Sequence, residues 1–171
     1  MTIELRKYDN EAELHNWVER PENISSVFGE VIYLPGNFFI KTKRNKGGKP
    51  DGFVLDLKNS TWTIIESELI EHGVWDHIAE QIIRFIVASK NDSTKRIIRD
   101  KFFEKIEGDS QIGTISKQLN VDNHRLMQYI DNILESNTPE IAIFINDVNE
   151  DLEDMIEALN VTRTNLLYER M

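Results

Sequence analysis

Apolar and polar residues alternate in two neighbouring stretches of the chain, Gly52 to Leu57 and Thr61 to Leu69. This period of two is typical of β-strands. The segment KNST, residues 58–61, joins the two stretches closely enough for an antiparallel connection. The pattern therefore predicts a β-hairpin.

Apolar residues at helical spacing indicate helices on both sides of this hairpin. One helix is expected over Glu11 to Glu19, and Pro21 is expected to end it. Another is predicted over Trp75 to Ser89, where the apolar stripe is continuous. A third is predicted over Ser93 to Ile106, with Ser93 or Thr94 near its cap.

Two shorter strands are predicted before the hairpin. Phe28 to Leu34 and Asn37 to Lys43 contain β-forming residues on either side of Pro35-Gly36. The following segment, Gly47 to Pro50, has the composition of a flexible break. The region therefore predicts two strands, a turn and a loop that leads into the hairpin.

The second half of the chain predicts helices and two further strands. Ile112 to Leu134 has the pattern of two short helices, which either pack plainly or form a helix-turn-helix. Asp131 in the second helix is unusual for a recognition helix, so plain packing is favoured over a DNA-binding regulator. Glu140 to Asn146 is expected to be a buried strand, Glu150 to Leu159 a helix, and Asn165 to Tyr168 a final strand.

This order of elements predicts one domain over residues 1–171 with an α/β (α+β) fold, a central mixed β-sheet flanked by helices. Within it we distinguish a core region (11–89), a helical segment (93–135) and a final strand-helix-strand unit (140–171).

Composition narrows the class of protein. The chain has no cysteine, which excludes disulfides and thiolate metal sites. It has neither a signal-peptide pattern nor an apolar run of the roughly 20 residues that span a bilayer, so a cytoplasmic location without membrane contact is expected. The net charge of -10 argues against a generally basic surface for nucleic acid.

The charge is unevenly distributed. Residues 109–171 carry 12 acidic side chains against 4 basic ones. In contrast, the nine residues KTKRNKGGK (41–49) contain five basic side chains and no acid. This segment is either a solvated loop tip or a phosphate contact for nucleic acid, made by Lys41, Lys43, Arg44, Lys46 and Lys49.

Three carboxylates lie at the ends of the predicted hairpin. Glu66 and Glu68 project from the same face of their strand, about 7 Å apart along it. They repel each other unless a cation joins them, and Asp51, before the first strand, can lie opposite them. Because converging carboxylates are the ligands that Mg²⁺ or Mn²⁺ prefers, this end of the hairpin is a candidate metal site. Exposed turn acids without a metal are the alternative.

The same stretch resembles the core of the PD-(D/E)xK nuclease superfamily, the fold of many restriction endonucleases. Pro50-Asp51 matches the first motif element, and Glu66-Ser67-Glu68 occupies the second. Gln81 and Phe85 stand where the family's following helix carries a glutamine and an aromatic residue. Glu30 matches the acid that several members supply ahead of the hairpin. Glu68 replaces the motif lysine, which makes the chain similar to members with Glu-x-Glu.

The resemblance implies a metal-dependent DNA endonuclease with a restriction-endonuclease-like fold. Asp51 and Glu66 would be metal ligands, with Glu68 as general base or third ligand. Gln81 would orient a water or phosphate, and Glu30 would be an accessory acid. DNA is the implied partner, and double-strand cleavage would favour a homodimer. A nuclease-like binding or assembly module without activity is the alternative that Glu68 raises.

The histidines give a weaker signal. His77 stands one helical turn before Gln81 and either shares its face or, as is more common for a lone histidine on an amphipathic helix, is structural. His72 and His77 lack the four-residue spacing of a helical zinc pair, so the sequence argues against a zinc enzyme.

Overall fold

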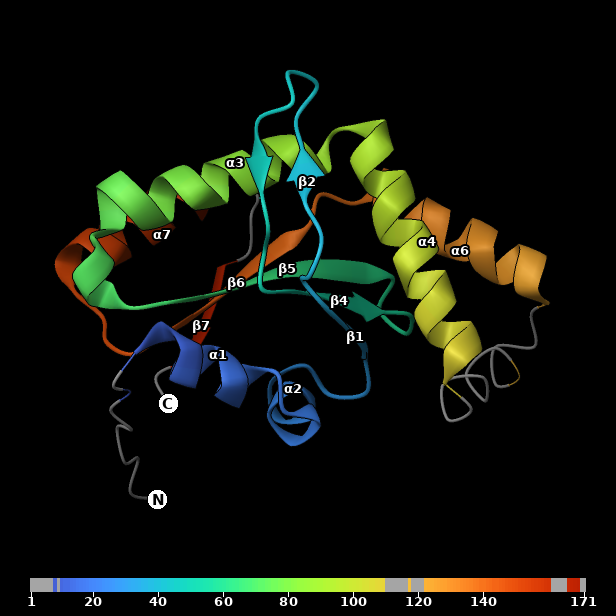
Figure 1. The fold of residues 1–171 in the computed structure, drawn as a ribbon, viewed down its shortest axis with the longest axis horizontal. Coiled ribbons are helices and arrows are strands. Elements are labelled where there is room, and N and C mark those ends of the chain that lie inside the picture. Colours follow the sequence, from blue (N-terminus) through green and yellow to red (C-terminus); the bar gives the residue numbers. More distant parts are fainter. Residues whose placement is uncertain (1–7, 9, 110–116, 118–121, 161–165, 170–171) are drawn as a thin grey trace.

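The protein has an α+β fold in which helices cover both faces of a mixed sheet (Figure 1). The computed structural model describes residues 8, 10–109, 117, 122–160 and 166–169. The predicted coarse fold class, a mixed sheet flanked by helices, is confirmed.

The sheet has five strands in the order β1-β4-β5-β6-β7. β1 and β4 are antiparallel, as are β4 and β5, whereas β5, β6 and β7 run parallel. The strands are β1 (Ile32–Pro35), β4 (Gly52–Asp56), β5 (Thr61–Glu68), β6 (Glu140–Ile145) and β7 (Leu166–Glu169). The predicted hairpin is thus β4 and β5, and β5 lies at the centre of the sheet.

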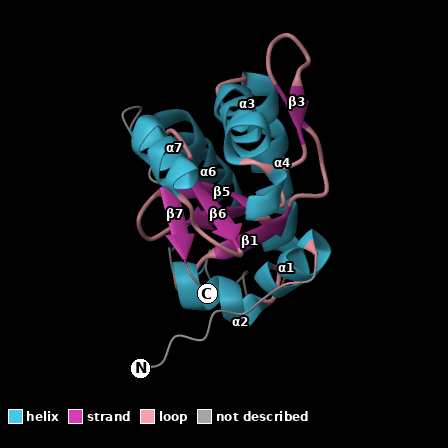
Figure 2. Ribbon diagram, turned by 90° about the vertical axis from the view of Figure 1, so that its left-hand side faces the viewer, coloured by secondary structure: helices cyan, strands magenta, loops and turns pink. Residues whose placement is uncertain are grey.

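Helices form a layer on each side of the sheet (Figure 2). One layer consists of α1 (Glu11–Val18) and α2 (Pro21–Phe28). The other contains α3 (Ala79–Ser89), α4 (Asp92–Gly108), α6 (Asn123–Ser136) and α7 (Glu150–Asn160). Two short turns, η1 (Ile70–His72) and the π-helical η2 (Val74–Ile78), connect β5 to α3.

Alternation along the central strand divides the apolar core between these two layers. Trp62 and Ile64 pack with the four-helix layer, whereas Ile65 packs with α1 and α2. The same period of two places Glu66 and Glu68 on the face of Trp62 and Ile64. β6 lies between both layers, and five of its six residues are buried, which explains its continuous apolar run.

The turn of the β4–β5 hairpin is tied to α6. The Tyr129 hydroxyl donates to the Leu57 carbonyl at 2.8 Å and shares a hydrogen bond with Ser60 Oγ at the same distance. Trp62 Nε1 donates to the carbonyl of Asn137 at 3.0 Å. These contacts fix the end of the hairpin that is distant from the carboxylates.

A second hairpin, β2 (Ile40–Lys41) and β3 (Gly47–Gly48), extends across α3 (Figure 1). The predicted flexible break at Gly47-Gly48 is therefore wrong. A Cβ on Gly48 would lie 2.8 Å from the ring of Phe85, so only glycine allows this close approach of strand and helix. The Lys41 carbonyl accepts from Asn91 Nδ2 and Thr94 Oγ1, which anchors the hairpin to the start of α4.

Two further predictions of element ends need correction. Pro21 follows the first helix but also begins α2, which continues to Phe28. The strand predicted to start at Phe28 therefore starts at Ile32, as β1. The N-cap of α4 is Asn91, whose side chain accepts from the Ser93 amide, and not Ser93 or Thr94. Proline is favoured at a first helical position because its missing N–H would have no partner there.

The predictions for the C-terminal half are largely confirmed. β6, α7 and β7 occur within one residue of their expected ranges. Of the predicted pair of helices at Ile112 to Leu134, α6 represents the second, and the first falls mostly outside the described residues. No helix within the described ranges combines the length and apolar character needed to cross a membrane.

Candidate functional site

The candidate site lies where β5 ends and β4 begins. Glu66 and Glu68 are 3% and 1% exposed, although each carries a carboxylate. They continue the buried face that Trp62 and Ile64 begin. A carboxylate that is buried to this extent needs hydrogen-bond donors or positive charge around it.

Asp51 and Glu66 form a joined pair. The Asp51 amide donates to Glu66 Oε2 at 3.4 Å, and the Ser67 amide donates to Asp51 Oδ2 at 2.6 Å. The register explains this pairing, because Gly52 lies opposite Ile65 and the residue before Gly52 reaches the end of β5. The structure therefore brings together the two residues that the motif assigns as metal ligands.

Gln81 supports the pair from α3. Its Nε2 donates to Glu66 Oε1 at 2.5 Å. Its Oε1 is buried and has no hydrogen-bond partner among the described residues. Phe85, one turn later, is fully buried against the sheet. The side chain of Gln81 thus holds the Glu66 carboxylate in place, whereas the sequence suggested a role on water or phosphate.

Negative charge accumulates around Glu66. Burial raises the pKa of Glu66 well above its usual value, and the carboxylates of Asp51, Glu68 and Glu11 raise it further. Burial also raises the pKa of Glu11, with contributions from Glu68 and Asp51. The site consequently favours either a bound proton or a bound cation over an isolated set of ionised carboxylates.

Glu68 faces two histidines. Its Oε1 contacts Nδ1 of His72, and its Oε2 lies 3.1 Å from Nε2 of His77. Among the described residues, this is the group of three acids or histidines whose ligand atoms all lie within 4.8 Å of one another. The spacing argument against a zinc pair assumed a regular helix, and the turns η1 and η2 replace that helix here. The two imidazoles therefore meet at one carboxylate although they lack the spacing of a helical pair.

Helix α1 contributes two residues that the sequence did not assign to the site. His15 Nδ1 lies 3.4 Å from Asp51 Oδ1, and Glu11 Oε2 lies 3.6 Å from His72 Nδ1. The Asp51 carboxylate raises the pKa of the His15 imidazole. The available signal was their spacing of four residues, which places both side chains on one face of the predicted helix.

Glu30 does not reach the site. It is exposed and precedes β1, whose first residue, Ile32, pairs with Leu55. The other end of β1, Pro35, pairs with Gly52 next to Asp51. Glu30 therefore lies at the opposite end of the sheet from the carboxylate pair, and its assignment as an accessory acid is corrected. The acids ahead of the hairpin that approach the site are Glu11, beside His72, and Glu19, which lines the cavity of Asp51.

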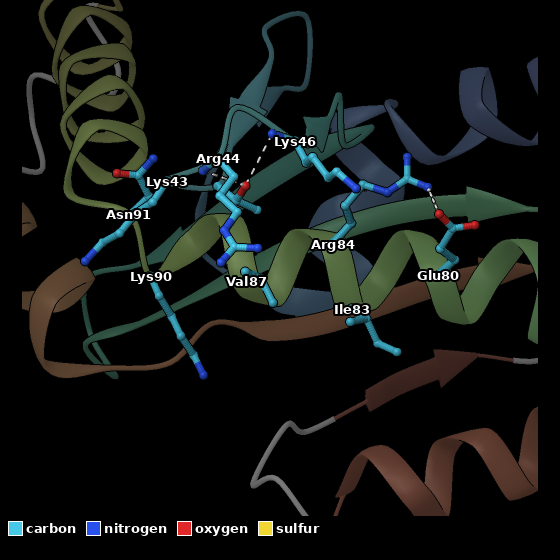
Figure 3. A pocket seen from close by; sticks show the side chains of 10 residues that line it. Lys43, Arg44, Lys46, Glu80, Ile83, Arg84, Val87, Lys90 and Asn91 are labelled. Carbon is cyan, nitrogen blue, oxygen red and sulfur yellow. Dashed lines mark hydrogen bonds and ion pairs between the residues drawn. The ribbon is translucent and has the colours of Figure 1, made fainter.

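Residues of the predicted basic segment (41–49) line two separate cavities. Lys49 lines a cavity of about 270 Å³ that also includes His15, Gly36 and Asp51. The hairpin tip faces a different groove of about 580 Å³, on the outer side of α3 (Figure 3). Its basic lining consists of Lys43, Arg44, Lys46, Arg84 and Lys90. Lys41 lies at the base of the hairpin and lines neither place.

The groove also has an apolar side. Ile83 and Val87 on α3 are 50% and 48% exposed and line it between the basic residues. Figure 3 shows Arg84 turned toward Glu80, to which it is bonded at 2.6 Å. The groove is therefore lined by basic side chains and by two exposed apolar side chains of α3.

Comparison with protein-family models, with curated proteins and with solved structures finds no match for this chain. What the fold and the site define is an α+β protein in which the partly exposed Asp51 lies beside the buried Glu66, with an adjoining Glu-His-His group.

Proposed function

We propose that this protein is a divalent-metal-dependent DNA endonuclease with a restriction-endonuclease-like fold. The observation that carries the proposal is the joined pair of Asp51 and Glu66 at one end of a β-hairpin. Mg²⁺ is commonly bound by one or two carboxylates, with substrate phosphate and water completing its shell. The pair matches that ligand set, and the order of the surrounding motif agrees with it.

The electrostatics of the pair support a resident cation. The raised pKa of Glu66 reflects burial next to further carboxylates without a charge to compensate it. Mg²⁺ or Mn²⁺ held by Asp51 and Glu66 would supply that charge, polarise a phosphodiester and lower the pKa of an attacking water. The hydrogen bond from Gln81 fixes the orientation of one ligand.

Other residues of the site have roles on the substrate side. Lys49 lines the same cavity as Asp51, and its positive charge there supports attraction of a phosphate. His15, beside Asp51, carries an imidazole that exchanges protons near neutral pH. Glu68 contacts two histidines and is almost fully buried, which makes it less suited than a solvated group to accept a proton from water.

The basic groove supports contact with a nucleic-acid backbone away from the cleavage point. Its five cations come from the tip of the β2–β3 hairpin and from the outer face of α3 and its C-cap (Figure 3). Such contacts position a duplex without reading its sequence. The overall negative charge of the protein would confine DNA to these two basic places.

A catalytically inactive nuclease-like module for DNA binding or assembly is the second candidate. The observation that favours it is Glu68, which replaces the motif lysine and is held by His72 and His77. In that case the carboxylate pair would bind metal or protons without supporting hydrolysis.

The test is cleavage of supercoiled plasmid and short duplexes with Mg²⁺ or Mn²⁺. Asp51→Asn and Glu66→Gln keep the shape of the side chains but remove a metal-binding charge. Each is expected to lower the cleavage rate by at least about 100-fold, because even loss of an outer-shell partner of a bound metal costs 10–100-fold in affinity or activity. Glu30→Gln is the matched control, because it removes an exposed acid at the far end of the sheet and should leave the rate unchanged.

Cleavage that survives both Asp51→Asn and Glu66→Gln would overturn the assignment of the pair. Metal uptake by the wild-type protein, with DNA binding but no cleavage, would instead establish the inactive module. Absence of both Mg²⁺ and Mn²⁺ binding at millimolar concentration, measured by calorimetry, would exclude the metal-dependent nuclease.

A further inference from the structure

The histidines after β5 form a group with Glu68 that the proposed Mg²⁺ pair does not use. Both oxygens of the Glu68 carboxylate face an imidazole nitrogen. One ligand atom from each residue lies within 4.8 Å of the other two. We propose that Glu68, His72 and His77 form a second metal site, which binds Zn²⁺ in preference to Mg²⁺.

The backbone explains how residues with this spacing converge. Glu68 ends β5, His72 ends η1, and His77 lies in the π-helical turn η2. Gly73, between the two histidines, has a φ of 84°, a conformation that glycine adopts without strain. The chain therefore reverses direction between His72 and His77 and returns the second imidazole to the same carboxylate.

The separation between the ligand atoms of His77 and Glu68 fits a tetrahedral ion. Zinc bonds of about 2.0–2.2 Å to nitrogen and oxygen place neighbouring ligand atoms about 3.3 Å apart. His77 Nε2 and Glu68 Oε2 are 3.1 Å apart, close to that separation. The two imidazole rings are arranged edge to face, with an interplanar angle of 79° and centroids 5.7 Å apart, and are therefore not stacked.

The donor set distinguishes this group from the Asp51–Glu66 pair. Two imidazoles and one carboxylate are a ligand set of catalytic zinc enzymes, with a fourth position left for water. Mg²⁺ prefers oxygen ligands, whereas imidazole suits Zn²⁺ and its neighbours in the first transition row. The two sites should therefore select different ions.

Burial and access also fit a bound cation. Glu68 is 1% exposed, so its carboxylate depends on positive charge supplied by its immediate partners. His72 and His77 are 39% and 52% exposed, which leaves the histidine side open to an entering ion. Glu11, 3.6 Å from His72, adds a second carboxylate at the rim.

The experiment is calorimetric titration of the full-length, chelator-treated protein with ZnCl₂ at pH 7.5. The wild-type protein is expected to bind one Zn²⁺, and millimolar Mg²⁺ is expected not to displace it. His72→Gln and His77→Gln should each weaken binding by at least about 100-fold, because even loss of an outer-shell partner costs 10–100-fold in metal affinity. His15→Gln is the matched control and should bind Zn²⁺ like the wild-type protein.

The proposal is overturned if the wild-type protein takes up no Zn²⁺, which would make the group an ion-paired cluster only. It is also overturned if both His72→Gln and His77→Gln retain wild-type affinity, or if His15→Gln weakens binding as much as they do. Circular dichroism of each variant separates loss of a ligand from loss of the fold.

This inference does not depend on nuclease activity, and the two can fail separately. Asp51→Asn should abolish Mg²⁺-dependent cleavage but retain Zn²⁺ binding. Cleavage without Zn²⁺ binding would contradict the proposed zinc site but not the nuclease activity. Zn²⁺ binding without any Mg²⁺-dependent cleavage would contradict the proposed nuclease activity but not the zinc site.

Discussion

The hydrogen bond from Gln81 to Glu66 gives the most direct test of how the site is built. Gln81→Leu keeps the approximate volume of the side chain but removes the amide that donates to Glu66 Oε1 at 2.5 Å. A hydrogen bond to a charged group contributes about 1.5–3 kcal/mol to stability, and one to a neutral group about 0.5–1.5 kcal/mol. The loss should therefore be larger at a pH where Glu66 is ionised.

For a protein of this length, each kcal/mol of destabilisation lowers Tm by about 2–4 °C. Gln81→Leu is accordingly expected to lower Tm by roughly 3–12 °C when Glu66 is ionised. Urea unfolding in the presence of EDTA, followed by tryptophan fluorescence, measures the same loss as a free energy. Trp62, which is 1% exposed, provides a probe in the core beside the site.

A double-mutant cycle separates the hydrogen bond from other effects of the substitution. Glu66→Leu removes the acceptor, so a further Gln81→Leu change in that background should cost little. The coupling free energy between the two positions is expected to be about 1.5–3 kcal/mol. A coupling below about 0.5 kcal/mol, within the usual error of additivity, would refute a supporting role for Gln81.

Three further outcomes are expected. Because the pKa of Glu66 in the folded protein lies above its usual value of 4.5, the contribution of Glu66 to the free energy of unfolding in EDTA should be fully present below that value and be lost as the pH rises through the raised pKa. The difference in unfolding free energy between the wild-type protein and Glu66→Gln should therefore change with pH over this range, and a constant difference would contradict it. Replacing Lys43, Arg44 and Lys46 together by alanine should reduce the slope of log affinity for duplex DNA against log salt by up to about 3, and an unaltered slope would exclude the groove as a phosphate contact. Tyr129→Phe removes the two hydrogen bonds that hold the β4–β5 turn and should cost about 1–3 kcal/mol in urea unfolding, so a loss below about 0.3 kcal/mol would show that the turn is held by other contacts.

The β4–β5 hairpin and its carboxylate pair could be predicted from the sequence because both depend on local rules. The period of two fixes which residues share a face of β5, and the short connection fixes the register. Once Gly52 pairs with Ile65, the position of Asp51 beside Glu66 follows. Local periodicity also suffices for β6 and α7, whose apolar patterns have a single simple interpretation.

The residues that the sequence misplaced depend on packing between distant segments. Glu30 and Glu11 are both acids ahead of the hairpin, and only the docking of α1 against the end of β5 decides which one approaches the site. Similarly, Gly47 and Gly48 have a low preference for strands. Glycine fits at these positions because a Cβ on Gly48 would meet the ring of Phe85 and a Cβ on Gly47 would meet the backbone of Ile40.

The histidine group shows a different limit of sequence reasoning. The spacing rule for metal-binding histidines describes a regular α-helix, and it correctly finds no such pair at His72 and His77. The chain instead passes through a 3₁₀ turn, a glycine with positive φ and a π-helical turn before α3 begins. Irregular turns of this kind are frequent at functional sites, and their side-chain geometry does not follow from a fixed period.

The acids at the end of β5 are difficult to explain by stability alone. Glu66 and Glu68 are buried and continue the face of β5 on which Trp62 and Ile64 belong to the apolar core. Apolar residues there would extend the core without desolvating charge, so the sequence departs from local consistency at the point where the carboxylates gather. The two acids differ in their partners: Glu66 accepts from the Asp51 backbone amide and from the Gln81 side-chain amide, whereas Glu68 contacts two imidazoles. This difference is why we propose two sites of different ion preference at the strand end, and titration with Mg²⁺ and Zn²⁺ tests them separately.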